Sequence, residues 1–192
     1  MASTPRWPKE ISRYSDPATD GGIYPVSGPT AGQRMEIEPP TMEETETVAD
    51  LWVSLARGQR SHGSHLRSEA NRATITDAIS RHLITGGLLV ARDPDIVGFV
   101  MFGPEAGSYE QDVTRGVVHN LYVVAGRRDE GVGTALLEAA ERRLAEDGAD
   151  TVALEVMAGN DSARRFYERA GYRPHRIELE KRTESDNVTT EG

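Results

Sequence analysis

A Gly-rich turn between an apolar run and a long amphipathic pattern constrains this chain most. The turn follows the strand-like run Leu121-Tyr122-Val123 and reads Arg128-Asp129-Glu130-Gly131-Val132-Gly133-Thr134. In a strand–turn–helix unit, the first N–H groups of the helix have no partner within the helix, and the helix dipole adds partial positive charge there. Glycine lets the main chain approach a bound anion closely. The unit therefore predicts a binding site for a phosphate group.

A second patterned segment lies a dozen residues beyond this expected helix. It contains Asn160, Ala163, Phe166, Tyr167, Gly171 and Tyr172. Asn160 is a typical helix N-cap, because its side chain can accept a hydrogen bond from a free N–H group of the first turn. Gly171 is a typical residue at the end of a helix. The segment thus predicts a short helix that carries a tyrosine close to the anion site.

Composition narrows the class of protein. The 192 residues suffice for one domain with tails, and 31 acidic against 22 basic residues give a formal net charge of -9. Because nucleic acids are negatively charged, this excess of acidic residues argues against a nucleic-acid partner. There are no cysteines, so thiolate metal sites and a cysteine nucleophile are excluded. No apolar run approaches the ~20 residues of a membrane span and no secretory signal is visible, so we expect no membrane partner and a cytoplasmic location.

The pattern along the chain predicts a single mixed α/β domain between two tails. We expect a disordered tail over residues 1–33, a domain over residues 34–182 and a polar tail over residues 183–192. Strands are expected at 34–38, 88–92, 96–102, 116–124, 151–157 and 172–179, and helices at 41–57, 75–83, 131–147 and 160–170. The helix at 131–147 makes a parallel crossover between its two flanking strands.

The two motifs resemble those of the GNAT superfamily of acetyl-CoA-dependent N-acetyltransferases. The family's pyrophosphate loop, Arg/Gln-x-x-Gly-x-Gly/Ala, is matched by Arg128, Gly131 and Gly133. Its later segment, Asn-x-x-Ala-x-x-Phe/Leu-Tyr-x-x-x-Gly-Phe/Tyr, is matched from Asn160 to Tyr172. The element order is similar over about residues 34–182, and the specific motifs cover residues 120–172. The resemblance implies a GNAT-like central twisted mixed sheet of about six to seven strands flanked by four helices.

The resemblance also implies a division of roles around acetyl-CoA as co-substrate, without a metal. The pyrophosphate would be wrapped by the amides of Arg128, Asp129, Glu130, Gly131, Val132, Gly133 and Thr134. The pantetheine arm would lie along Leu121, Tyr122 and Val123 like an added strand. Asn160 and Tyr167 would complete the cofactor side. A primary amine would attack the thioester directly, and Tyr167, with an ordinary pKa of ~10, would protonate the departing thiolate.

The general base is left open between two side chains and water. His119 is one candidate, because it lies on the strand that leads into the cofactor site and an imidazole pKa near ~6.5 suits proton removal from an amine. Strict alternation places His119 on the same face as Leu121 and Val123. Glu155 is the second candidate, because it interrupts the apolar run of the next strand. An ordered water molecule is the third.

One departure from the family pattern supports a competing hypothesis. Asp129 and Glu130 stand where relatives carry Gly and a basic or amide residue, and carboxylates beside a pyrophosphate are unfavourable unless they point away. The alternative is a catalytically silent GNAT-like domain that senses acyl-CoA or binds a protein. The acceptor, a small-molecule or peptide amine, is not readable from the sequence. Neither is the choice between monomer and homodimer.

Overall fold

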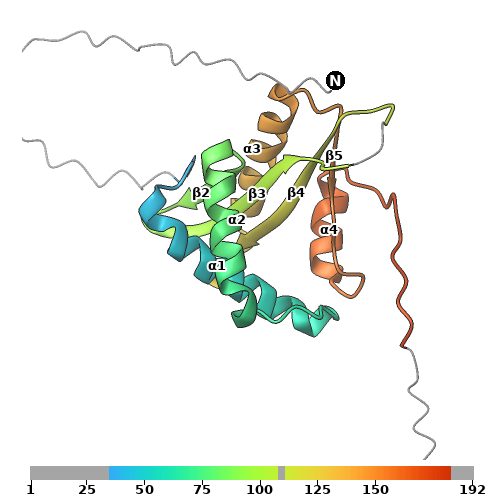
Figure 1. Ribbon diagram of the computed structural model, residues 1–192, viewed down its shortest axis with the longest axis horizontal. Helices are drawn as coiled ribbons and strands as arrows, with labels where there is room; N and C mark the ends of the chain where they lie inside the picture. Colours follow the sequence, from blue (N-terminus) through green and yellow to red (C-terminus); the bar gives the residue numbers. More distant parts are fainter. Residues whose placement is uncertain (1–34, 108–110, 183–192) are drawn as a thin grey trace, which may run out of the picture. The chain divides into compact units, whose positions relative to one another are not determined.

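The structure is a computed structural model that describes residues 35–107 and 111–182. The tails predicted over residues 1–33 and 183–192 therefore lie outside the described residues. The described residues form one sheet whose strands follow one another in chain order. Its strands are β1 (Glu36–Glu38), β2 (Leu88–Arg92), β3 (Ile96–Pro104), β4 (Arg115–Val123) and β5 (Thr151–Leu154). All neighbours pair antiparallel except β4 and β5, which are parallel (Figure 1).

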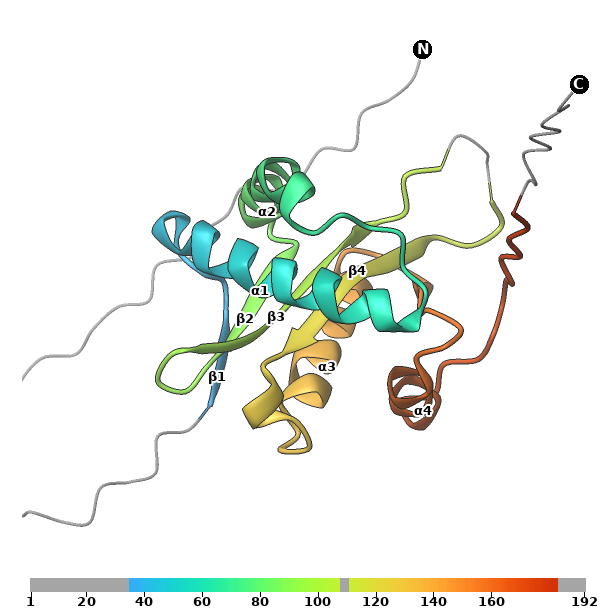
Figure 2. The ribbon, with the colours of Figure 1, turned by 90° about the horizontal axis from the view of Figure 1, so that it is seen from below.

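Four helices cover the two faces and one end of this sheet. They are α1 (Thr45–Gln59), α2 (Arg72–Thr85), α3 (Val132–Glu146) and α4 (Asp161–Arg169). Helices α1 and α2 lie on one face and α3 lies on the other (Figure 2). Helix α4 stands beside β5 (Figure 1). Single helical turns lie at Met42–Glu44, Arg60–His62, Glu69–Asn71 and Ala125–Arg127. None of the helices in the described residues is long and apolar enough to cross a membrane.

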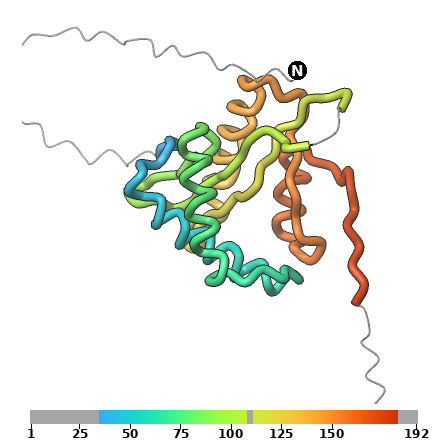
Figure 3. The backbone as a smooth tube through the Cα atoms, viewed as in Figure 1, coloured from blue at the N-terminus to red at the C-terminus, as the bar shows by residue number. Residues whose placement is uncertain are grey.

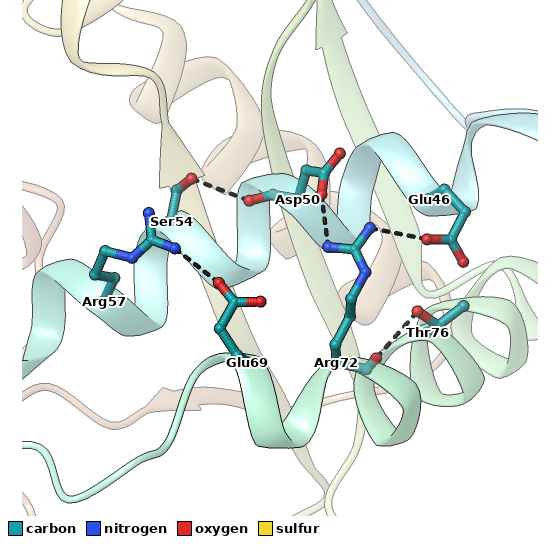
Figure 4. Close-up of polar contacts among 7 residues, drawn as sticks. All are labelled: Glu46, Asp50, Ser54, Arg57, Glu69, Arg72 and Thr76. Atoms are coloured by element: carbon teal, nitrogen blue, oxygen red, sulfur yellow. Dashed lines mark hydrogen bonds and ion pairs between the residues drawn. The ribbon is translucent and has the colours of Figure 1, made fainter.

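The layer formed by α1 and α2 is held by apolar packing and by ion pairs. Val48, Trp52 and Ile79 are buried against the β2 and β3 side chains of this face. At the outer surface, the guanidinium of Arg72 contacts Asp50 at 2.6 Å and Glu46 at 2.9 Å (Figure 4). These pairs are exposed to solvent and each adds little to stability, so apolar burial supplies most of the packing energy of the layer.

Helix α3 packs across the opposite face because its apolar stripe matches the sheet side chains there. Leu136, Ala140 and Leu144 are buried against Val100 and Val118. Gly116 of β4 makes this contact close, because a Cβ atom at that position would lie 2.8 Å from Leu144. The predicted crossover helix is therefore present, and it carries the chain from β4 to the parallel strand β5 (Figure 3).

A β-bulge in β4 breaks the alternation that the sequence suggested. Phe102 pairs with Val118, but Met101 pairs with Asn120, so His119 is an extra residue on β4. Val118 and Leu121 both face α3, whereas His119 contacts the ring of His82 on α2. The prediction that His119 shares a face with Leu121 and Val123 was wrong, because one inserted residue reverses the direction of the side chains.

The mixed α/β class and the four helices are confirmed, and the described residues form five strands rather than six or seven. Strand β5 ends at Leu154 instead of residue 157. Residues 173–182 form no strand, although their alternation suggested one. Ile177 and Leu179 in this segment are 82% and 89% exposed. Alternation predicts a strand only where a neighbouring strand is available, and no described segment pairs with this one.

Candidate functional site

Strands β4 and β5 separate at the level of the bulge, and this separation defines the candidate site. Their pairing runs from Arg115 opposite Thr151 to Val118 opposite Leu154 and then stops. The remaining part of β4, which contains Leu121, Tyr122 and Val123, pairs with β3 on one side only. Among the described residues no strand pairs with its other edge. The main-chain groups on that edge are therefore unpaired with any described strand, and the expectation that these three residues contact a pantetheine arm stays a prediction.

The Gly-rich turn connects this open edge to the N-terminus of α3. Gly131 has a left-handed backbone with φ of 83°, and Asp129 is a non-glycine residue with φ of 63°. The first intrahelical bond of α3 joins the Ala135 N–H group to the Gly131 carbonyl. The N–H groups of Val132, Gly133 and Thr134 therefore have no partner in the helix and lie at its positive end. This arrangement matches an anion site.

The Arg127 side chain holds the carboxylate of Glu130 beside the Gly-rich turn. The Nε atom of Arg127 donates to Glu130 at 2.6 Å, and its Nη2 atom donates to Asp93 at 2.8 Å. Arg127 is therefore one cation shared by two carboxylates, and it offsets the charge of Glu130 only in part. The contact with Glu130 is local, three residues along the chain, whereas the contact with Asp93 has no local signal because Asp93 lies 34 residues earlier. Arg128 donates from its Nε atom to the Val123 carbonyl at 3.3 Å, which joins the turn to the end of β4.

Helix α4 brings the predicted tyrosine to the α3 side of the site. Asn160 is its N-cap, as expected, since Oδ1 of Asn160 accepts from the Ala163 N–H group at 3.1 Å. The Phe166 ring lies 3.6 Å from the position that a Cβ atom on Gly133 would take. Tyr167 is partly buried between the Phe166 and Tyr172 rings, at centroid distances of 5.1 Å and 5.8 Å. Burial raises the pKa of Tyr167 to about 12, so its hydroxyl group is protonated at neutral pH.

The structure also places the two candidate bases near one another. Burial lowers the pKa of His119 below its ordinary value, the nearby His82 lowers this pKa further, and the charge of Glu155 opposes both effects. The His82 and His119 rings meet edge to face at 5.3 Å. Nδ1 of His82 lies 2.8 Å from the Ala78 carbonyl, which orients the His82 ring. A neutral His119 is ready to accept a proton. The sequence did not identify His82 as a neighbour of His119, because α2 and the β4 bulge come together only in the fold.

The loop between α1 and α2 closes around the end of β5. Nδ1 of His62 lies 3.0 Å from the Gly159 carbonyl, and Nε2 of His65 lies 3.1 Å from Glu180. These two histidines therefore face different partners and do not converge. Within residues 35–107 and 111–182, no group of three or more His, Asp or Glu side chains is placed to hold a metal ion.

A mixed sheet that opens beside a helix N-terminus, with a tyrosine-bearing helix at the opening, defines an acyltransferase type of fold. The family model described as Acetyltransferase (GNAT) family matches residues 46–172. The chain belongs to this family. The match covers α1 through the end of the tyrosine motif, and it confirms the resemblance that the two motifs suggested.

Comparisons with individual proteins agree with this assignment. The chain is 35% identical over 142 residues to a mycothiol acetyltransferase of Clavibacter sepedonicus, which covers 72% of this chain and 44% of that protein. A mycothiol acetyltransferase of Streptomyces avermitilis is 35% identical over 100 residues, or 52% of this chain and 31% of the relative. The chain thus spans less than half the length of these relatives.

Solved structures share the fold at lower identity. A GCN5-related N-acetyltransferase from Ralstonia eutropha has a TM-score of 0.63 at 24% identity, covering 78% of this chain and 99% of that one. An aminoglycoside N-acetyltransferase in complex with CoA has a TM-score of 0.63 at 16% identity, covering 81% of this chain and 99% of that one. At these identities the likeness shows the fold alone.

Proposed function

We propose that this protein transfers an acetyl group from acetyl-CoA to a primary amine. The observation that carries the proposal is the separation of β4 from β5 beyond Val118 and Leu154, directly before the free N–H groups of α3. An extended arm can add to the edge of Leu121–Val123 while its pyrophosphate meets the α3 N-terminus. In acetyl-CoA the thioester stands at the free end of this arm, and the pyrophosphate is attached to its other end.

The proposed reaction has one covalent step. The amine nitrogen attacks the thioester carbonyl carbon, a C–N bond forms and the C–S bond breaks. A main-chain N–H group near Leu121 stabilises the charge that develops on the carbonyl oxygen. The proton of the amine passes to His119, and the hydroxyl proton of Tyr167 passes to the departing sulfur. The products are an amide and CoA, and exchange with solvent restores both side chains.

The protonation states of the two groups support these roles. A tyrosine with a pKa of about 12 holds its proton at neutral pH and is therefore available as a donor, and the raised pKa makes it a weaker acid than an ordinary tyrosine. A histidine whose pKa is lowered by burial is neutral at pH 7 and can accept a proton. Glu155 lies close enough to His119 to act on its charge, and we assign it a supporting role in proton removal.

The acceptor side is formed by the loop of residues 58–67 and the segment after β5. The names of the relatives make mycothiol-related amines one class to test, and the aminoglycoside enzyme with the same fold makes aminoglycosides another. Peptide N-termini and polyamines complete the panel. The screen incubates each amine with acetyl-CoA and reads acetylated product by mass spectrometry. We expect a mass increase of one acetyl group on a primary amine.

Measurements of acetyl-CoA binding and of acetyl transfer distinguish an acetyltransferase from a catalytically silent domain. Titration of the protein with acetyl-CoA is expected to release heat and to raise the melting temperature. Binding without acetyl transfer to any amine in the panel would favour an acyl-CoA sensor. Absence of binding would overturn the proposed use of acetyl-CoA.

A further inference from the structure

The last described segment, residues 174–182, leaves the sheet and is attached to the rest of the domain at one point. It joins no strand, and the side chains of Ile177 and Leu179 are almost fully exposed (Figure 1). Its one hydrogen bond with another described residue joins Glu180 to His65, with 3.1 Å between Oε2 and Nε2. A segment with so few buried contacts opens and closes at a low cost in free energy.

The point of attachment is the loop between α1 and α2. Nδ1 of His62, in the same loop, lies 3.0 Å from the Gly159 carbonyl. The Met157 side chain lies 3.7 Å from the position that a Cβ atom on Gly63 would take. These partners of the loop follow β5, which ends at Leu154, where the pairing of β4 with β5 stops. The segment is therefore held on the loop that borders the acceptor side of the proposed site.

The charge of this loop favours the attachment of an acidic side chain. Residues 57–67 contain three arginines and two histidines and no carboxylate. Arg57 pairs with Glu69 at 2.7 Å, whereas Arg60 and Arg67 form no ion pair with a described residue. A carboxylate that comes within about 10 Å of these guanidinium groups is attracted to them at 0.1 M salt. The loop therefore favours the position of Glu180 beside it.

Lys181 follows Glu180 directly and brings a primary amine to this loop. The chain has two lysines, Lys9 and Lys181, and Lys9 lies outside the described residues. Lys181 is exposed, and its amine stands on a flexible four-carbon stem. Because Lys181 belongs to the same chain as the site, its effective concentration there is on the order of millimolar at any protein concentration.

We propose that the protein acetylates its own Lys181. This inference rests on the proposed function, because the chain itself supplies an acceptor to the same site. Nζ of Lys181 attacks the thioester carbon of acetyl-CoA, a C–N bond forms and the C–S bond breaks. The ammonium group loses two protons, of which one is balanced by the proton that ends on the sulfur of CoA and the other passes to solvent. The product is a neutral amide, so the side chain loses its positive charge.

The test incubates the whole chain with acetyl-CoA and no other amine, and follows the intact mass and the acetylated peptides by mass spectrometry. We expect one acetyl group on Lys181, added at least about tenfold faster than any acetyl group on Lys9, because Lys181 is held beside the site. The rate constant should not depend on protein concentration. Lys181→Arg keeps the charge and should abolish this modification.

Glu180→Gln tests whether the contact with His65 positions the lysine. It should slow the acetylation of Lys181 about two- to fivefold, the range expected when one exposed charged contact is lost. Glu178→Gln is the matched control, because it removes the same charge two residues earlier and Glu178 forms no ion pair with a described residue. The control should keep the wild-type rate, and equal rates in the two variants would overturn the proposed placement of Lys181.

Further results would overturn the inference. Equal acetylation of Lys9 and Lys181, or an unchanged rate at Lys181 in urea-unfolded protein, would show that the lysine reacts without the site. A rate constant that rises with protein concentration would show that Lys181 reacts in the site of another molecule. Acetyl transfer to an amine of the panel, with Lys181 unmodified, would overturn this inference and leave the proposed function intact. Absence of acetyl-CoA binding would overturn both.

Discussion

The ring of His119 meets the ring of His82 edge to face, with the two centroids 5.3 Å apart. One ring comes from the bulge of β4 and the other from the last turn of α2. Neutral imidazoles pack in this way without penalty, but two protonated ones repel each other. The contact therefore makes the protonation of His119, the proposed base on the sheet, depend on His82 in the helical layer.

The first prediction concerns the pH dependence of acetyl transfer. The pKa of His119 lies below its ordinary value of 6.5, because of burial first and His82 second. The rate should therefore stay high as pH falls to 6.5 and decline only below it, when the imidazole becomes protonated. His82→Phe keeps an aromatic edge but removes the second charge, so the decline should move to higher pH. Rates measured from pH 5 to 8 test this, and an unchanged profile in the variant would contradict it.

The same shift predicts a stability effect with a defined sign. Just below pH 6.5 the imidazole of His119 is protonated in the unfolded chain but still neutral in the folded one. The unfolded state then binds more protons, so the free energy of unfolding falls as the pH drops from about 6.5 toward the folded-state pKa. His119→Gln should lose this part of the pH dependence. Urea unfolding at several pH values measures the difference between the two proteins.

A second prediction tests Tyr167 as the general acid. Tyr167→Phe should lower the rate of acetyl transfer at least about tenfold, in line with the usual contribution of such groups, while acetyl-CoA binding is retained. Because the chain has no cysteines, a thiol reagent added to an assay with a thiol-free amine reports only the released CoA. Tyr172→Phe is the control, since its hydroxyl group donates to Glu141 at 2.7 Å and has a structural partner. Equal rates for wild type and Tyr167→Phe would remove Tyr167 from the mechanism.

A third prediction concerns the ion pairs of the Gly-rich turn. Arg127→Gln leaves Glu130 and Asp93 without their shared cation, so Glu130 then repels the pyrophosphate. We expect the Kd for acetyl-CoA to rise about three- to tenfold at low salt, and less at high salt, because the groups are partly exposed and screened. Adding Glu130→Gln to Arg127→Gln should restore most of the affinity. Failure of the second substitution to restore binding would show that Arg127 acts in another way.

A fourth prediction separates the two glycines of the motif. Gly131→Ala should destabilise the protein by about 1–2 kcal/mol, because its φ of 83° is left-handed and costs an L side chain that amount. Gly133→Ala should leave stability unchanged or raise it by up to ~1 kcal/mol. A Cβ atom there lies 3.6 Å from Phe166, an ordinary contact, and alanine favours the helix. Chemical denaturation measures the free energy of unfolding of both variants. Equal changes in the two would contradict the different roles given to Gly131 and Gly133.

The residues that the sequence placed well are those whose signal is local. Asn160 caps α4, Gly131 precedes α3 and the apolar stripe of α3 faces the sheet, and each follows from neighbours within a turn or two. The β4 segment at Leu121–Val123 and the anion-binding turn were predicted together for the same reason. Their functional roles in this chain stay predictions until the experiments above are made.

The features that the sequence missed depend on contacts distant in the chain. The contact of Arg127 with Asp93 was overlooked because Asp93 becomes adjacent only after the sheet forms, whereas its contact with Glu130 spans three residues. His82 was overlooked because α2 meets β4 only in the folded protein. The strand expected over residues 172–179 failed for the converse reason, since alternation alone does not supply a neighbouring strand. The bulge at His119 has no signature in the apolar pattern, because the residues on both sides of it look like one continuous strand.

The register around His119 has a consequence for how this strand can change. If His119 were deleted, Val118 would still face Phe102 and Asn120 would still face Met101, so the ladder would become regular. Leu121, Tyr122 and Val123 would keep their present directions. The pairing of β3 with β4 therefore does not need this residue, but the bulge that it makes lies where β4 leaves β5. Deleting His119 would remove both the imidazole and the bulge, whereas His119→Gln would remove the imidazole alone.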